Sequence, residues 1–140
     1  MIGSLNLQKD IFLQICVHAS QVYPQECCGI LLGDGKKLRV QEIYKAQNKS
    51  VGEPGREHFL IDPLELYQAE RKADEKGLDV IGFYHSHPDC LALLSREDEE
   101  YMIPGMIYFI ISLTDGKIAE WKIYRKTKPD ERAFELNTDC

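Results

Sequence analysis

The run LDVIGFYHSH, residues 78–87, constrains the fold of this chain more than any other stretch. It is almost continuously apolar up to its histidines, which is typical of a strand in the centre of a sheet, covered on both faces. The run MIYFIISL, residues 106–113, has the same character and predicts a second buried strand. At 140 residues the chain is long enough to bury a core as one domain. We therefore expect a single α/β domain with one central mixed β-sheet and flanking helices.

Three helices are predicted around this sheet. Apolar residues recur at roughly helical spacing over 8–23, and Pro24 ends the run. The segment 64–77 has an apolar side and ends in a glycine, a frequent residue after a helix. A short helix over 95–103 is closed by a Pro-Gly pair.

Strands are predicted from apolar or alternating runs between turn signals, with two hairpins across the turns GDGKK and TDGK. The predicted strands are 29–33, 38–46, 57–63, 78–87, 106–113 and 118–126. The final stretch TKPDERAFELNTDC, residues 127–140, is polar, and we expect it to be partly loose. We accordingly place one domain at 1–128 and a polar tail at 129–140.

Charge and cysteine content exclude several classes of protein. The net charge is −6 and no long stripe of Lys and Arg is present, so a nucleic-acid partner is not expected. The N-terminal residues lack a signal-peptide pattern, and no apolar run reaches the roughly 18 residues of a membrane helix, so we expect a cytoplasmic protein without a membrane partner. The five cysteines are an odd number without a C-x-x-C pair, which predicts reduced thiols.

Two of the four histidines stand one residue apart at the end of the first buried strand. Residues i and i+2 of a strand point to the same face, so His85 and His87 project side by side, with Ser86 opposite. Pro88 is expected to end the strand. A shared metal such as zinc would bind both imidazoles in their neutral forms and would need a third protein ligand. Two surface histidines at a strand end are the alternative interpretation.

Asp98 is the leading candidate for the third ligand. Ser95 resembles an N-cap, which places Asp98 in the first turn of the short helix, where the preceding loop can fold back over the strand end. Acids are also common in first turns because they complement the helix dipole, and S-x-x-D resembles a capping box. Glu97, Glu99 and Cys90 are competing candidates.

A hydrolytic metal site also needs a base that takes a proton from water. Glu26 stands directly before the apolar run CCGILLG. An acid at the start of a buried strand is costly unless it has a partner or a role. An exposed glutamate at a loop end is the alternative, and sequence spacing alone does not decide between the two.

Taken together, these residues match a known pattern. H-S-H-P followed by S-x-x-D, with P-x-E-C-C-G-I-L-L-G upstream, resembles the JAMM (MPN-plus) metalloproteases, whose signature is a remote Glu, then H-x-H, ten residues and Asp. Ten residues, 88–97, separate the second histidine from Asp98 here. The resemblance runs from the first predicted helix to the strand that contains WKIY. It implies a JAMM/MPN-like, cytidine-deaminase-like α/β architecture.

The resemblance also implies a role for each matching residue. The positions that match the ligands of one Zn²⁺ per chain are His85, His87 and Asp98. Glu26 matches the general acid/base, and Ser95 matches the serine that helps to stabilise the oxyanion. One departure is visible, since members of this branch often have proline before the serine and this chain has Leu94. The departure leaves the ligands intact but puts the setting of Ser95 in doubt.

The chain looks most like the small, stand-alone prokaryotic members. These resemble peptidases that cleave after the C-terminal Gly-Gly of ubiquitin-like proteins, and the resemblance implies a β-grasp sulfur carrier as the partner, trimmed of a cysteine or another short extension. A non-catalytic MPN-type protein-interaction module is the alternative, although relatives of that kind have lost ligands that this chain retains. Zinc-dependent deamination is disfavoured because the H-x-E and P-C-x-x-C signature is missing.

Overall fold

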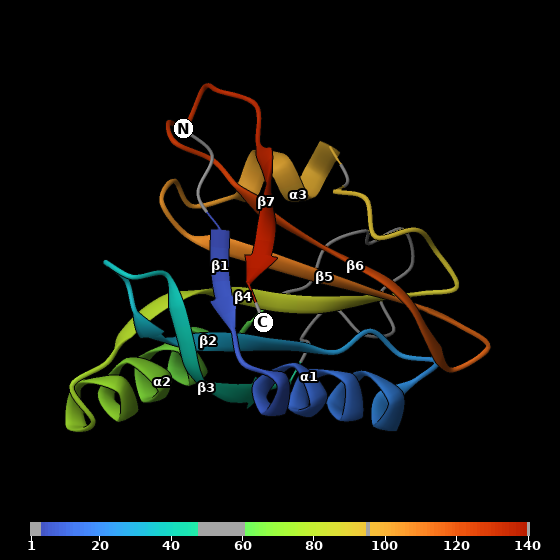
Figure 1. The fold of residues 1–140 in the computed structure, drawn as a ribbon, viewed down its shortest axis with the longest axis horizontal. Helices are drawn as coiled ribbons and strands as arrows, with labels where there is room; N and C mark the ends of the chain where they lie inside the picture. Colours follow the sequence, from blue (N-terminus) through green and yellow to red (C-terminus); the bar gives the residue numbers. More distant parts are fainter. Residues whose placement is uncertain (1–3, 48–60, 95, 140) are drawn as a thin grey trace.

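The computed structural model describes residues 4–47, 61–94 and 96–139. Within these ranges seven strands close into one barrel in the order β1-β3-β2-β4-β5-β6-β7 (Figure 1). The strands are β1 (Ser4–Leu7), β2 (Cys28–Asp34), β3 (Arg39–Ala46), β4 (Asp79–Pro88), β5 (Ile107–Thr114), β6 (Lys117–Arg125) and β7 (Phe134–Asp139). The helices are α1 (Lys9–Val22), α2 (Pro63–Glu75) and α3 (Arg96–Tyr101).

The two apolar runs form the centre of the sheet, as predicted. They are β4 and β5, which pair in parallel, so that His85 lies beside Ile110. On its other side β4 pairs antiparallel with β2, and β2–β3 and β5–β6 are the two expected hairpins. Residues 107–113 of β5 are all buried, which explains why this strand lacks polar alternation. The expected mixed sheet with helices is therefore confirmed.

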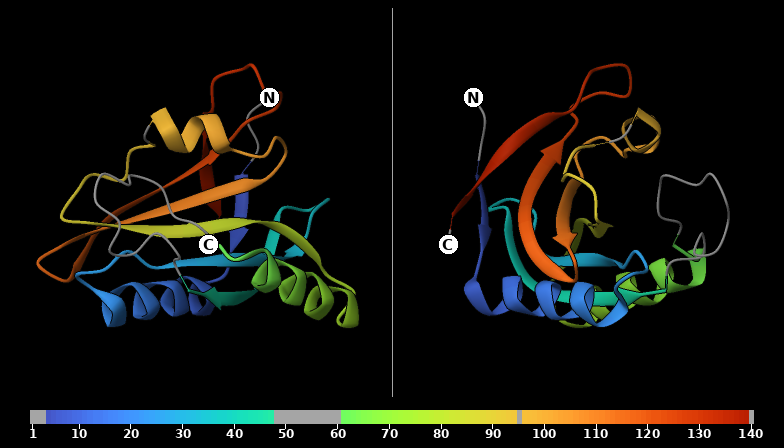
Figure 2. Two further views of the ribbon diagram at one scale, coloured as in Figure 1. Left: turned by 180° about the vertical axis from the view of Figure 1, so that it is seen from behind. Right: turned by 90° about the vertical axis from the view of Figure 1, so that its right-hand side faces the viewer.

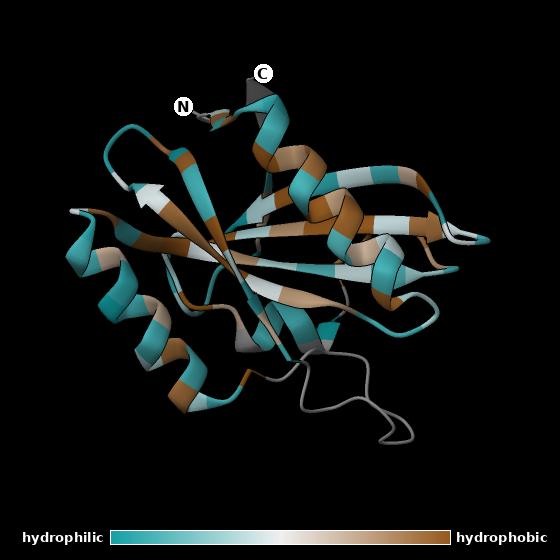
Figure 3. Cartoon of the chain, turned by 90° about the horizontal axis from the view of Figure 1, so that it is seen from below, coloured by the Kyte–Doolittle hydropathy of each residue, from teal (hydrophilic) through white to brown (hydrophobic). Residues whose placement is uncertain are grey.

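The helices α1 and α2 cover opposite faces of the sheet. The buried side of α1 is formed by Ile11, Ile15 and Ala19, which recur every fourth residue and join one apolar cluster. On α2 the residues Ala69 and Ala73 do the same for a second cluster. Figure 3 shows the outer sides of both helices, where α2 is mainly hydrophilic and α1 carries scattered hydrophobic positions. Among the described residues, no helix is long and apolar enough to cross a membrane.

The end of the chain differs from the expectation of a loose tail. Residues 134–139 form β7, which pairs antiparallel with β6 and parallel with β1 and thereby closes the barrel (Figure 2). Leu136 is buried in the core beside the other strands. The short apolar alternation of β7 is hidden among polar residues, which is why the tail gave no strand signal.

Two other sequence expectations have a different outcome. The strand β1 was not anticipated, because its four residues are too few for a periodicity to be seen, although Leu5 and Leu7 are fully buried. The predicted strand at 57–63 falls mostly on residues that the structure does not describe. The strand β4 includes Pro88, one residue beyond the expected end.

Replacing Leu136 by alanine should lower the free energy of unfolding by about 2–4 kcal/mol, because it leaves a cavity in the core. Glu135 is the matched control on the same strand, since its side chain is exposed and its ion pair with Lys122 is a long surface contact of 3.8 Å. Its replacement by alanine should cost less than about 1 kcal/mol. Urea unfolding measures both, and equal small effects would show that β7 is not part of the cooperative fold.

Candidate metal centre

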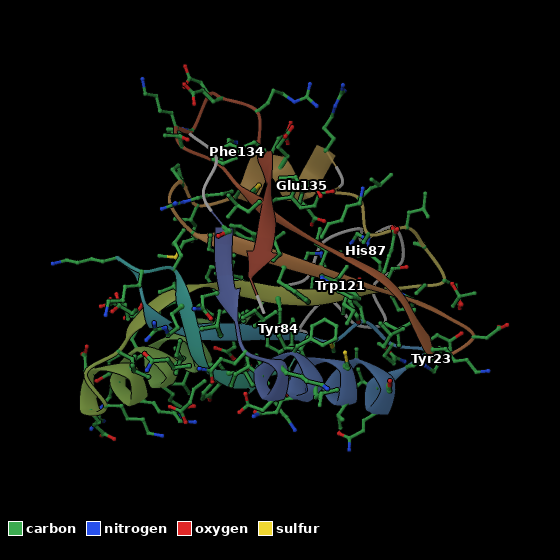
Figure 4. The ribbon with its side chains drawn as sticks, viewed as in Figure 1. Tyr23, Tyr84, His87, Trp121, Phe134 and Glu135 are labelled. Carbon is green, nitrogen blue, oxygen red and sulfur yellow. The ribbon has the colours of Figure 1, made fainter. Side chains whose placement is uncertain are left out.

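The C-terminal half of β4 carries both histidines on one face. His85 is fully buried, and its Nε2 lies 3.1 Å from Nε2 of His87. This is the arrangement that strand alternation predicted. Figure 4 shows His87 toward the C-terminal end of β4 and Tyr84, which comes earlier in the strand, on the side of α1.

A loop carbonyl sets the orientation of the His87 ring. The Nδ1 atom lies 2.9 Å from the carbonyl oxygen of Leu91, which can only accept, so Nδ1 carries the proton. The lone pair of Nε2 in the neutral ring is then directed toward His85. Burial, reinforced by the nearby His85, lowers the pKa of His87 and favours this neutral form.

Asp98 reaches the histidine pair from α3. Its Oδ2 lies 3.6 Å from Nε2 of His85 and 3.9 Å from Nε2 of His87. Ligands at 2.0–2.1 Å around a tetrahedral zinc ion are about 3.3 Å apart, so the separations of 3.1, 3.6 and 3.9 Å found here are near those of zinc ligands. The donor set of two neutral imidazoles and one carboxylate also suits zinc. The residues present therefore fit the metal that the resemblance implies.

Glu26 approaches the same pair from the start of β2. One carboxylate oxygen of Glu26 and one ring nitrogen each of His85 and His87 lie within 4.8 Å of one another. Burial raises the pKa of Glu26 to about 7, with His85 opposing the shift and Asp98 adding to it. A carboxyl group with such a pKa can both accept and return a proton near neutral pH. The exposed loop-end interpretation of Glu26 is therefore wrong.

Ser86, which the strand pattern placed opposite the histidines, holds Glu26 near them. Its hydroxyl oxygen accepts a hydrogen bond from the backbone N–H of Cys27 at 2.8 Å, and its own N–H donates to the carbonyl of Cys27 at 3.0 Å. The pairing of β2 with β4 is thereby extended to the residue after Glu26. Nothing in the sequence indicates this contact, because the two segments are far apart in the chain.

The loop between β4 and α3 is braced by the β5–β6 hairpin. Glu120 accepts a hydrogen bond from the N–H of Ala92 at 2.8 Å, and the hydroxyl of Tyr124 donates to the carbonyl of Ala92 at 3.2 Å. Leu94, the departure from the family pattern, is half-buried and packs against the apolar cluster that contains Met102. These contacts hold the loop without a proline.

The other candidates for the third ligand have different positions. The carboxylate of Glu99 lies against the segment that joins β6 to β7, where it accepts a hydrogen bond from the N–H of Ala133 at 2.9 Å. Cys90 is exposed, whereas the side chain of Asp98 is buried beside the histidines. Ser95 and the side chain of Glu97 lie outside the described residues.

The family model described as prokaryotic homologs of the JAB domain matches residues 8–124. The chain belongs to this JAMM/MPN family. It is 36% identical over 124 residues to the desampylase of Haloferax volcanii, covering 84% of this chain and 87% of that protein. It is 27% identical over 125 residues to the CysO-cysteine peptidase of Mycobacterium tuberculosis, covering 86% and 82%. The expected family and the expected JAMM-type metallopeptidase class are confirmed.

The fold of this JAB protein is also found in a solved structure. A protein from Desulfitobacterium hafniense superimposes with a TM-score of 0.80 at 29% identity, covering 96% of this chain and 91% of that chain. The JAMM/MPN-like architecture expected from the sequence is therefore confirmed.

Proposed function

We propose that this JAB protein hydrolyses the peptide or isopeptide bond after the C-terminal Gly-Gly of a ubiquitin-like protein, and that it trims a short extension or a cysteine from a β-grasp sulfur carrier. The observation that carries the chemistry is the convergence of Glu26, His85, His87 and Asp98 at one end of β4. The substrate class is supported by the relatives named desampylase and CysO-cysteine peptidase.

The residues that would hold one Zn²⁺ are His85, His87 and Asp98, through the two Nε2 atoms and Oδ2. Zinc bound there would polarise the scissile carbonyl and lower the pKa of a water ligand toward about 7. The protein's own part is to keep the His87 imidazole neutral and correctly turned, which its burial and its contact with the Leu91 carbonyl support. Loss of the burial or of the contact with the Leu91 carbonyl would lower the affinity for zinc.

Glu26 would move the proton during hydrolysis. Its carboxylate would accept the proton of the attacking water and return it to the nitrogen of the leaving group, and a pKa of about 7 suits both steps. Ser95 would donate a hydrogen bond to the developing oxyanion. That role rests on the family resemblance alone.

A pocket beside Glu26 would receive part of the substrate. It has a volume of about 590 Å³ and lies between α1, the start of β2, the end of β3 and α2, with Lys45 and Glu65 among its lining residues. A Gly-Gly end has no side chains, so its backbone can approach the metal site closely. Leu91 and Leu93 are exposed on the braced loop and would meet the folded part of the carrier.

The test is to incubate the zinc-loaded protein with the β-grasp carriers of its own organism and to follow their mass. Each carrier is supplied with a C-terminal cysteine, with a short peptide, or joined to a lysine through an isopeptide bond. We expect at least one form to be cut after Gly-Gly, and the same carrier ending in Ala-Ala to stay intact. A zinc-loaded protein that cuts none of them, yet forms a stable complex with a carrier, would instead support a binding module.

A further inference from the structure

The helix that carries Asp98, α3, is too short to be stable without tertiary contacts. α3 has only six residues, and an isolated helix of that length is unstable in water. Asp98 can face the histidines only if other parts of the fold hold α3 in place.

We propose that Lys126 and Glu99 are positioning residues of the metal site, because they fasten α3 to the segment that joins β6 to β7 and so set the place of Asp98. The inference rests on the proposed role of Asp98 as a metal ligand. Figure 2 shows this segment beside α3 at the top of the molecule.

Lys126 holds α3 and the turn after it. Its side chain is only 4% exposed, and Nζ donates a hydrogen bond to the carbonyl oxygen of Glu99 at 2.9 Å. A buried ammonium group is costly unless it is hydrogen-bonded, and here it meets a carbonyl near the negative end of the helix dipole. The carbonyl of Lys126 also accepts from the N–H of Gly105 at 2.8 Å.

Glu99 makes the second attachment. Its carboxylate accepts from the N–H of Ala133 at 2.9 Å, and it pairs with Nε of Arg132 at 3.2 Å. The segment it contacts is itself held by the barrel, because Arg125 at the end of β6 pairs with Phe134 at the start of β7. The position of α3 is thereby coupled to the closure of the barrel.

Polar contacts add to the apolar packing that begins at Met102, directly after α3. A hollow of about 660 Å³ is lined on one side by Arg96 and Glu99 of α3 and on the other by residues 129–133. Between α3 itself and residues 129–133, the attachments that the structure shows are the polar contacts of Glu99. Since metal sites tolerate errors of only about 0.2 Å in ligand distance, a small displacement of α3 should be felt at the metal.

The test measures metal binding and does not depend on a substrate. Glu99→Ala and Lys126→Met remove the two attachments, and Glu99→Gln keeps an acceptor for the N–H of Ala133. Glu42→Ala is the matched control, because Glu42 of β3 makes a 2.7 Å ion pair with Lys76 after α2, away from the site. Zinc affinity is measured by competition with a chromophoric chelator, the absorption spectrum of the Co²⁺-loaded protein reports ligand geometry, and urea unfolding reports metal-free stability.

We expect Glu99→Ala and Lys126→Met to weaken zinc binding about 10- to 100-fold, as is typical for outer-sphere partners of a metal site, and to alter the Co²⁺ spectrum. Glu99→Gln should restore most of the affinity, and Glu42→Ala should change stability alone. If Glu99→Ala and Lys126→Met both lose stability but keep the zinc affinity and the Co²⁺ spectrum of the unmodified protein, the proposal is overturned. Asp98→Asn separates the two questions: if it too leaves affinity unchanged, the proposed ligand set fails as well.

Discussion

Replacing Glu26 by glutamine should abolish cleavage of an extended carrier while one zinc ion per chain stays bound. Glutamine keeps the size of the side chain but cannot accept the proton of the attacking water. General acid–base catalysis contributes about 10²- to 10⁴-fold, so kcat should fall by about that factor. The raised pKa of Glu26 reflects its burial beside the histidines, and this placement is what the substitution tests.

Glu42→Gln is the control for this prediction. The carboxylate of Glu42 on β3 pairs with Nζ of Lys76 at 2.7 Å and does not line the pocket, so this variant should keep both activity and zinc. Turnover is followed by mass spectrometry of the carrier, and zinc content by elemental analysis. Full activity of Glu26→Gln would sink the proposed proton transfer, whereas loss of zinc would place Glu26 among the ligands.

Replacing His87 by alanine should remove both zinc and activity. It deletes one of three proposed ligands, and loss of an outer-sphere partner alone costs about 10- to 100-fold in affinity, so the loss here should exceed about 100-fold. His87 is a better target than the fully buried His85, because its replacement disturbs the core less. Chelation of zinc from the unmodified protein should inactivate it in the same way, and added zinc should restore cleavage.

His18→Gln is the control for a general effect of losing a histidine. His18 lies on α1, buried, with its Nδ1 2.7 Å from the hydroxyl of Tyr84 and no part in the ligand set. This variant should keep one zinc per chain. Competition titrations with a chelator compare the two variants, and zinc affinity of His87→Ala equal to that of the unmodified protein would refute the ligand assignment.

Short-range patterns predicted most of the fold. The buried strands β4 and β5, both hairpins and the three helices follow from periodicities of two and of about 3.6 residues. The strands β1 and β7 were not predicted, because each has only two alternating apolar residues. These are Leu5 and Leu7 in β1, and Phe134 and Leu136 in β7. Their partners are also distant in the chain, so only the closed barrel shows that they belong together.

The sequence predicted which residues form the candidate site, but not how its acids are arranged in space. The family signature named Glu26 and Asp98, and the structure brings both next to the histidine pair. It also shows that Glu99, an acid of the same helix, points elsewhere. Without the structure nothing distinguished these acids physically, because their local surroundings in the chain are alike.

The chain by itself determined that His85 and His87 share a face, since alternation along a strand is a property of the local backbone and needs no distant contact. Tertiary structure alone decided which carboxylates reach them, through Ser86 bound to Cys27 on one side and α3 held by Lys126 on the other. Local periodicity acts over a few residues. The distance between remote segments depends on how the whole sheet closes, and that closure brings together the side chains of the candidate metal site.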